Sequence, residues 1–457
     1  MKYAKLALLA ALVLMWAAAI PAAAADNGAD GGGNDSVVKN ENQAAGGEMG
    51  KKKIPTQPEN ETWGLFDPGH GFLIGRGPLG EMSISGYGLL RYINQMPASQ
   101  TYTDHLGNIH NVDARNDFFS HRIMVWLKGW LFSPKFIYTV TIWTVNTTDQ
   151  DAIFMNFGYQ FHQRFNLYGG IVGNGGSRSL LGSHPYWLGH DRVMADEFFR
   201  PYFTEGIWAQ GELFRGFWYH AVVGNNNSAL GIKASELDRD PTFGGSVWWM
   251  PTTGEFGPRG AYGDWESHEK LALRFGISGC YSPEQRYNDD PLQPPKNTTL
   301  KLADAVNLFA QGALAPDVTV TNADYHIFSV DAGMKYLGVF LQGEFYHRTL
   351  NGFVADGVLP LEEIVDQGFY VQAAFFPIPK KLEIYGVTSQ IYGDEDAGFD
   401  DSSEYILGAN YYPYPTRDIR VNLQLMDVNH SPVGSTFGYY TSGQDGQTIA
   451  LGVSALF

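Results

Sequence analysis

Charged and imidazole side chains gather in one stretch of the chain, residues 174–197, beside the aromatic residues Tyr186 and Trp187. The polar candidates in this stretch are Arg178, His184, His190, Asp191, Arg192 and Glu197. Fixed charges of this kind discriminate between ions at a narrow passage, and aromatic rings pack such a segment against a wall. We therefore predict an inward-folded loop that acts as an electrostatic filter, the alternative being an ordinary surface loop.

Motifs for bond-making chemistry are missing from the sequence. It has no phosphate-cradling glycine loop, no HExxH zinc motif and no nucleophile elbow. The single cysteine, Cys280, excludes an internal disulfide and a cysteine metal cage. We predict that the protein is not an enzyme and that it has no cofactor and no metal site.

Three other groups invite a functional interpretation. His105 and His110 stand near acidic residues as potential metal ligands, and the acidic run 393–401 offers oxygens to calcium or to a magnesium ion that bridges lipid A. We interpret both as polar surface loops. Five tryptophans offer faces for sugars, and we interpret them instead as an interfacial aromatic girdle. They are Trp126, Trp130, Trp143, Trp248 and Trp249.

The beginning of the chain is typical of an exported protein. Two lysines precede the apolar run 6–20, and small alanines follow it, which predicts a signal peptide over residues 1–25. A membrane anchor is the alternative, but the run is short for a spanning helix. Residues 26–62 are rich in Gly, Asn, Asp, Glu and Lys, which predicts a mobile periplasmic tail. The folded domain is expected over residues 63–457.

Strand-like alternation recurs throughout that domain. Within 270–282, Leu273, Phe275 and Ile277 share one face of a strand, whereas Arg274 and Ser278 share the other. The sixteen predicted strands are 83–93, 118–132, 135–146, 150–161, 165–173, 198–210, 214–224, 242–251, 270–282, 323–335, 338–349, 366–377, 382–391, 403–412, 417–428 and 447–457.

The connections between these runs alternate between long and short, as in an outer-membrane barrel with long extracellular loops and short periplasmic turns. Two connections depart from this rule, because 147–149 is short and 252–269 is long. The final run ends on Phe457, as expected for a strand that closes a barrel and carries an assembly signal. We predict an all-β fold, a transmembrane antiparallel β-barrel of sixteen strands in the bacterial outer membrane.

A barrel of this size encloses water, so polar side chains should face its lumen. The predicted lumen charges are Arg122, Lys128, Lys270, Arg274, Lys335, Arg348, Arg420, Asp331, Glu344 and Glu404. Their basic excess predicts a mild anion preference, despite a net charge of −17 for the whole chain. The alternative is that these charges hydrate the wall or pair with one another. No basic patch points to nucleic acid.

Several runs of residues resemble the phosphate-selective porin O/P type of outer-membrane porins. The resemblance spans about 71–457 and is carried by residues 89–95, 100–104, 116–126, 246–260 and 435–440. It implies a sixteen-stranded, homotrimeric porin for passive diffusion of small polar or anionic solutes. It also implies contact with outer-membrane lipid, lipopolysaccharide and the outer-membrane assembly machinery. No dense arginine ladder is present, so we assign no phosphate-binding residues.

Three alternatives to a general diffusion porin remain open at this point. The first is a phosphate-selective channel of the same family. The second is an outer-membrane barrel enzyme, which would need a Ser/His/acid set that the sequence does not display. The third is a secreted carbohydrate-binding β-sandwich, which would be soluble without detergent.

Overall fold

The computed structural model describes residues 71–457 apart from 147–149, 183, 228–235, 289, 291 and 435–437. The predicted signal peptide and tail, residues 1–25 and 26–62, therefore lie outside the described residues. Among the residues that the structure describes, no helix combines the length and the apolar character needed to cross a membrane.

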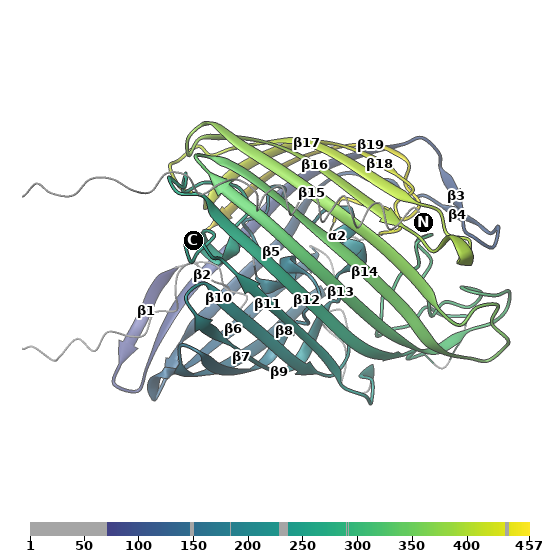
Figure 1. Cartoon of the computed structure of the whole chain (residues 1–457), viewed down its shortest axis with the longest axis horizontal. Coiled ribbons are helices and arrows are strands. Elements are labelled where there is room, and N and C mark those ends of the chain that lie inside the picture. Colours follow the sequence, from purple (N-terminus) through teal and green to yellow (C-terminus); the bar gives the residue numbers. More distant parts are fainter. Residues whose placement is uncertain are drawn as a thin grey trace, which may run out of the picture. The chain divides into compact units, whose positions relative to one another are not determined.

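Sixteen antiparallel strands form a closed ring, in which each strand pairs with its neighbours in the sequence and the last strand pairs with the first (Figure 1). The ring strands are β2 (Gly80–Pro97), β5 (Asn116–Leu131), β6 (Ser133–Asn146), β7 (Gln150–His162), β8 (Phe165–Gly173), β9 (Phe203–Phe214), β10 (Phe217–Gly224), β11 (Thr242–Trp249), β12 (Ala272–Gln285), β13 (Val320–Tyr336), β14 (Val339–Ala355), β15 (Ile364–Ile378), β16 (Leu382–Tyr392), β17 (Ser402–Tyr411), β18 (Ile419–Asn429) and β19 (Gly446–Leu456). This confirms the predicted fold class.

Alternating side chains explain why these segments form such a ring. In β18, Leu423 and Leu425 are about half exposed on the outer face, whereas Asn422 and Gln424 are each 1% exposed inside. An apolar exterior with a polar interior is the pattern of a barrel in lipid. Closure leaves no strand edge unpaired, since β19 meets β2 from Gly446↔Pro97 to Leu456↔Tyr87.

Each predicted strand corresponds to one ring strand, but 214–224 also includes Phe214 at the end of β9, and 198–210 begins too early. Phe198 and Phe199 belong instead to the short helix α2 (Met194–Phe199), and β9 begins only at Phe203. Pro201 lies between these two elements and cannot donate a backbone hydrogen bond to a sheet. The error arose because adjacent aromatic residues suit a strand as well as a buried helix.

Three short strands lie outside the ring or at its rim. β1 (Phe72–Gly77) pairs with the beginning of β2, and β3 (Thr101–Thr103) forms a hairpin with β4 (Ile109–Asn111). β1 and the β3–β4 hairpin lie at opposite ends of the ring (Figure 1). We call these the short-turn end and the long-loop end, respectively.

One long connection, loop 174–202 between β8 and β9, crosses the interior from the long-loop end. It carries α2 and the 3-10 helix η1 (Arg178–Leu181). The backbone N–H of Met194 donates to Glu404 (3.0 Å), and that of Ala195 donates to Ser389 Oγ (2.8 Å), both on inward positions of the ring. The structure thus folds the predicted filter segment into the barrel.

A second connection, segment 250–271 between β11 and β12, folds inward from the short-turn end and includes the 3-10 helix η3 (Pro258–Gly260). Its Phe256 is completely buried, and the Lys335 ammonium donates to the Phe256 carbonyl (2.7 Å). The Tyr262 N–H donates to the Tyr186 carbonyl of loop 174–202 (2.8 Å). This explains the long connection found where a short turn was expected; the other exception, 147–149, lies outside the described residues. A fourth short helix, η4 (Glu395–Ala397), lies at the long-loop end.

The aromatic-girdle interpretation is wrong for three of the five tryptophans. Trp126 and Trp248 are 0% and 2% exposed and face the interior, and Trp143 has the same orientation on β6. Trp249 does face outward and is 44% exposed, whereas the Trp130 indole donates to Glu81 (3.3 Å) near the short-turn end. Alternation separates two faces, but it cannot tell which face is outside when both are aromatic.

A buried ion pair fixes the end of α2 to the wall and yields a test of the interior. Arg348 donates twice to Asp366 Oδ2 (3.0 and 2.6 Å), its guanidinium lies 4.0 Å from the Phe198 ring centre, and both charged residues are fully buried. We expect Asp366→Asn to lower the free energy of unfolding by about 3 kcal/mol, because Arg348 loses its buried counter-charge. Urea unfolding in detergent, followed by circular dichroism, measures this loss.

The exposed residue Asp427 on β18 supplies the control for this experiment. Asp427→Asn should leave the unfolding midpoint unchanged, and the double variant Arg348→Met with Asp366→Leu should recover most of the loss. Equal stability of Asp366→Asn and the unmodified protein would contradict a stabilising role of the Arg348–Asp366 ion pair.

Candidate functional site

Most of the predicted lumen charges fasten the inward-folded segments to the wall. Arg122 donates to Asp191 (2.8 Å), which also lies 3.6 Å from Arg91. Arg420 donates to several backbone carbonyls of loop 174–202, among them that of Gly189 (3.1 Å). Glu344 accepts hydrogen bonds from the Arg178 N–H (2.9 Å) and from the hydroxyl groups of Ser329 and Tyr370.

Other wall charges pair with each other across neighbouring strands. Arg274 and Asp331 are 3.2 Å apart, and both are buried.

Lys128 is half-buried on an inward position of β5. Lys270 is exposed and lies outside the strand ring, because β12 begins only at Ala272. The alternation in the sequence continues past the residue where strand pairing begins.

Three of the predicted filter residues are fixed by specific partners. The His190 ring Nε2 lies 3.1 Å from Ser454 Oγ on β19. Glu197 accepts two hydrogen bonds from Arg200 (2.9 and 2.7 Å). The Arg178 guanidinium donates to the Gly260 carbonyl (2.6 Å) and stacks 4.4 Å from the Tyr262 ring centre, so it joins the two inward segments.

Two other filter residues, His184 and Arg192, border a cavity of about 60 Å³ inside the ring. We call this cavity the arginine pocket and define it by Arg122, Trp143, His184, Trp187, Arg192 and Arg259. Its three arginines come from β5, loop 174–202 and segment 250–271. No Asp or Glu among the described residues lines the pocket itself, but Asp191 lies 2.8 Å from Arg122 and Asp196 lies 3.5 Å from Arg192, both outside the lining.

The charge of the arginine pocket comes from its guanidinium groups. Burial, followed by the charge of Arg200, lowers the pKa of Arg192 to about 10, so Arg192 is still protonated at neutral pH. Burial, followed by the charges of Arg122 and Arg192, holds the pKa of His184 well below its ordinary value. The imidazole is therefore neutral at pH 7, and it adds a polar atom but no charge.

Sequence reasoning missed Arg259 as a member of this site. Arg259 lies in η3, and its Nε donates to the Gly182 carbonyl of loop 174–202 (2.8 Å). The unusual length of its connection was the only signal in the sequence. Which wall position such a segment reaches depends on contacts between residues distant in the chain, and alternation carries no information about these.

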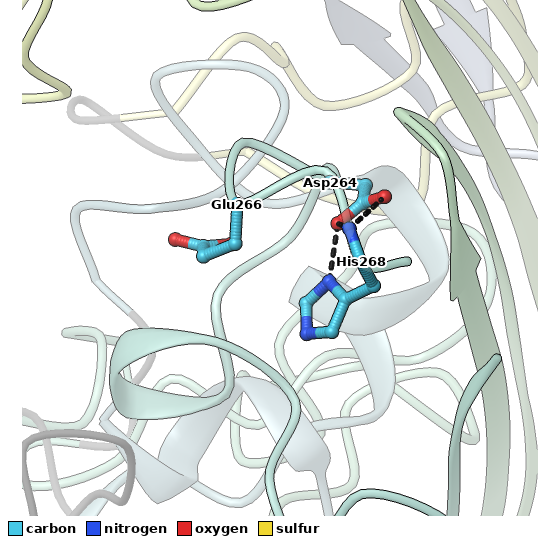
Figure 2. Close-up of side chains that lie close together, drawn as sticks. All are labelled: Asp264, Glu266 and His268. Atoms are coloured by element: carbon cyan, nitrogen blue, oxygen red, sulfur yellow. Dashed lines mark hydrogen bonds and ion pairs between the residues drawn. The ribbon is translucent and has the colours of Figure 1, made fainter. Parts of the chain in front are cut away.

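Segment 250–271 also contains a cluster of potential metal ligands, Asp264, Glu266 and His268. Their ligand atoms lie within 4.8 Å of one another, and Figure 2 shows hydrogen bonds between Asp264 and His268 but none to Glu266. The Nδ1 atom of His268 is hydrogen-bonded to the Asp264 carboxylate, and its Nε2 atom lies 2.9 Å from the Glu255 carboxylate. Glu266 pairs with Arg417 (3.1 Å). A metal ion would have to displace these bonds, so the arrangement is that of a structural anchor.

The other groups with possible metal ligands have separate partners. His105 lies 2.6 Å from Asp304, whereas His110 lies 2.8 Å from Asp104, so the two rings do not converge on one point. In the acidic run 393–401, Asp394 caps η4 and accepts a hydrogen bond from the Asp396 N–H (3.0 Å).

Phe457 lies at the seam where the ring closes. Its N–H donates to the Gly86 carbonyl (3.0 Å), and its carbonyl accepts from the Gly86 N–H (3.2 Å). Its ring lies 5.7 Å from that of Phe72 on β1 and is half exposed at the short-turn end.

Solved structures of outer-membrane proteins share this fold. Outer-membrane expressed OmpT of Vibrio cholerae is 9% identical with a TM-score of 0.50, and the match covers 84% of this chain and 100% of that chain. In-vitro folded OmpT of the same organism, described as an outer membrane protein in a trimer form, is 9% identical with a TM-score of 0.50, covering 83% and 100%. At this identity the likeness shows the fold alone. The chain has the closed antiparallel β-barrel fold of these outer-membrane proteins, as predicted.

No protein-family model matches the chain, and no curated protein sequence matches it. The resemblance to the phosphate-selective porin O/P type is therefore not confirmed, and the selectivity that it implies stays a prediction.

His268 makes the anchoring of segment 250–271 sensitive to alkali. Burial alone would lower its pKa, but the hydrogen bonds and charges of Asp264 and Glu255 outweigh burial and raise the pKa to about 9. Protonated His268 contributes its full stabilisation below about pH 6.5, which is its pKa in the unfolded chain. This contribution is lost as the pH rises through its folded-state pKa of about 9. We expect the free energy of unfolding to fall between pH 7 and pH 10 by on the order of 2 kcal/mol.

Chemical denaturation at a series of pH values tests this expectation. His268→Ala should flatten the profile over that range. His430→Ala is the matched control, because His430 is half exposed and 3.6 Å from its acidic partner Asp445. An equally steep decrease of stability with pH in His268→Ala would show that His268 is not the group responsible.

Proposed function

We propose that this protein is a porin for passive diffusion of small polar solutes, with a preference for anions. The observation that carries the proposal is the arginine pocket, which places three guanidinium groups and no carboxylate around a cavity inside a closed outer-membrane barrel. The two inward segments meet beside this cavity, where Arg259 donates to the Gly182 carbonyl, and we propose that a solute crossing the ring passes close to it.

The physical basis of the preference is local rather than global. The chain carries a net charge of −17, but most buried acids of the interior have cationic or hydrogen-bonding partners. Low-dielectric walls around a few fixed charges focus their field at the narrowest place. The three arginines of the pocket, two of which have a carboxylate partner, lie closer to the proposed path than the acidic residues of the surface loops do.

The remaining proposals concern assembly and solute. We propose a homotrimer in contact with lipopolysaccharide, with Phe457 as the feature that the assembly machinery recognises. This rests on the family resemblance and on the half-exposed terminal ring at the seam. No observation favours phosphate over other anions, and we therefore keep the broader solute class.

Replacing Arg192 should change ion selectivity. We expect Arg192→Gln to shift the reversal potential of a KCl gradient in planar bilayers toward cations, because one of the three pocket charges is lost. Arg178→Gln should have a smaller effect, since its guanidinium faces Tyr262 and the Gly260 carbonyl.

Lys270→Gln is the control for removing one positive charge, because Lys270 is exposed and lies outside the strand ring. The same shift in Lys270→Gln and Arg192→Gln would assign selectivity to the overall charge and contradict the proposal. Folded protein that never conducts would overturn the porin function itself.

A further inference from the structure

Polar atoms without partners border the arginine pocket. Nε2 of His184, Nε1 of Trp143 and Nε of Arg122 are buried and have no hydrogen-bond partner among the described residues. All three side chains line the pocket. A buried donor without an acceptor is destabilising, because it has lost its hydrogen bonds to water. An anion in the pocket supplies acceptors to these donors and contacts the guanidinium groups, of which Arg122 and Arg192 also have carboxylate partners, Asp191 and Asp196.

The rest of the pocket wall is apolar. Met124 and Leu180 are 5% and 6% exposed, and the Trp187 ring lies 4.4 Å from the Arg192 guanidinium. Trp143 and Phe203 complete this apolar part of the lining. Contact between these surfaces and an apolar group is favourable, whereas contact with a hydrated group is not.

The size of the pocket limits the ligand. A buried water needs about 10–15 Å³ of such space, so the 60 Å³ cavity holds about four waters. At about 30 Å³ of liquid volume per water this is about 120 Å³, less than the roughly 150 Å³ cavity that encloses benzene, so a six-membered ring fills the pocket and its far edge reaches the opening. Larger solutes would have to displace loop 174–202.

Building on the proposed function, we infer that the arginine pocket binds small organic monocarboxylates that carry a ring-shaped apolar body. The carboxylate accepts charge-assisted hydrogen bonds from the guanidinium groups, for which its planar geometry is suited. The ring lies against the indole and aliphatic walls. Inorganic phosphate satisfies the charge but has no apolar surface, so it loses hydration without gaining contact with Met124 or Leu180.

Titration calorimetry on the full, folded protein in detergent tests this site directly, with benzoate, acetate, inorganic phosphate and benzyl alcohol as probes. We expect benzoate to bind at least about tenfold more tightly than acetate or phosphate, and benzyl alcohol not to bind over the same range. Equal affinities for benzoate and acetate would overturn the role of the apolar wall. Tighter binding of phosphate, or of benzyl alcohol, would overturn the ligand class.

Two variants separate the charge from the wall. Arg259→Asn should weaken benzoate and acetate alike by about tenfold, and asparagine tolerates the positive φ of 55° at this position. Trp143→Leu should weaken benzoate by about tenfold more than acetate, because acetate loses only the indole donor whereas benzoate also loses the ring contact. Lys270→Gln should alter neither. Affinities that are unchanged in both pocket variants would place the bound ligand elsewhere and reject the inference.

Bilayer recordings distinguish failure of this inference from failure of the proposed function. A folded protein that conducts KCl but neither binds benzoate nor is blocked by it would refute the ligand class and leave the porin intact. A folded protein that binds benzoate but conducts no ion would support the pocket and refute the porin.

Discussion

Backbone hydrogen bonding around the ring constrains everything inside it. Strands in lipid have to pair on both edges, so β2 and β19 must meet, and the diameter is then set by the number of strands. Sixteen strands enclose more space than wall side chains can fill. Loop 174–202 and segment 250–271 occupy that space, and they enter it from opposite ends.

The polar interior is therefore mainly a set of attachment points. Arg420 holds backbone carbonyls of loop 174–202, Lys335 holds that of Phe256, and Arg348 holds Asp366 next to α2. Each of these charges would be costly to bury alone, and each has acceptors at close range. Three of the buried polar atoms that have no partner among the described residues belong to side chains that line one small cavity, together with three guanidinium groups. That cavity is held in a fixed position because the segments around it are attached to the barrel wall.

The strands could be predicted from the sequence because each depends on its own alternating residues. The inward fold of residues 174–197 could also be predicted, since aromatic residues and charges coincide there. Contacts across the ring could not be predicted in this way. The position of Arg259, the partners of Arg178 and the inward orientation of Trp143 all depend on which distant segments meet. Two predicted strands begin too early, at Phe198 and at Lys270, because the sequence pattern of a strand extends beyond the residues whose backbones pair.

The inward indoles give the molecule an optical property. Trp143 and Trp187 border the arginine pocket, whereas Trp249 faces outward on β11. Indole emission depends on nearby polar and quenching groups, so iodide in the aqueous phase and a brominated acyl chain in the bilayer would dim different members of this set. Occupancy of the interior can therefore be followed by intrinsic fluorescence, without an attached dye.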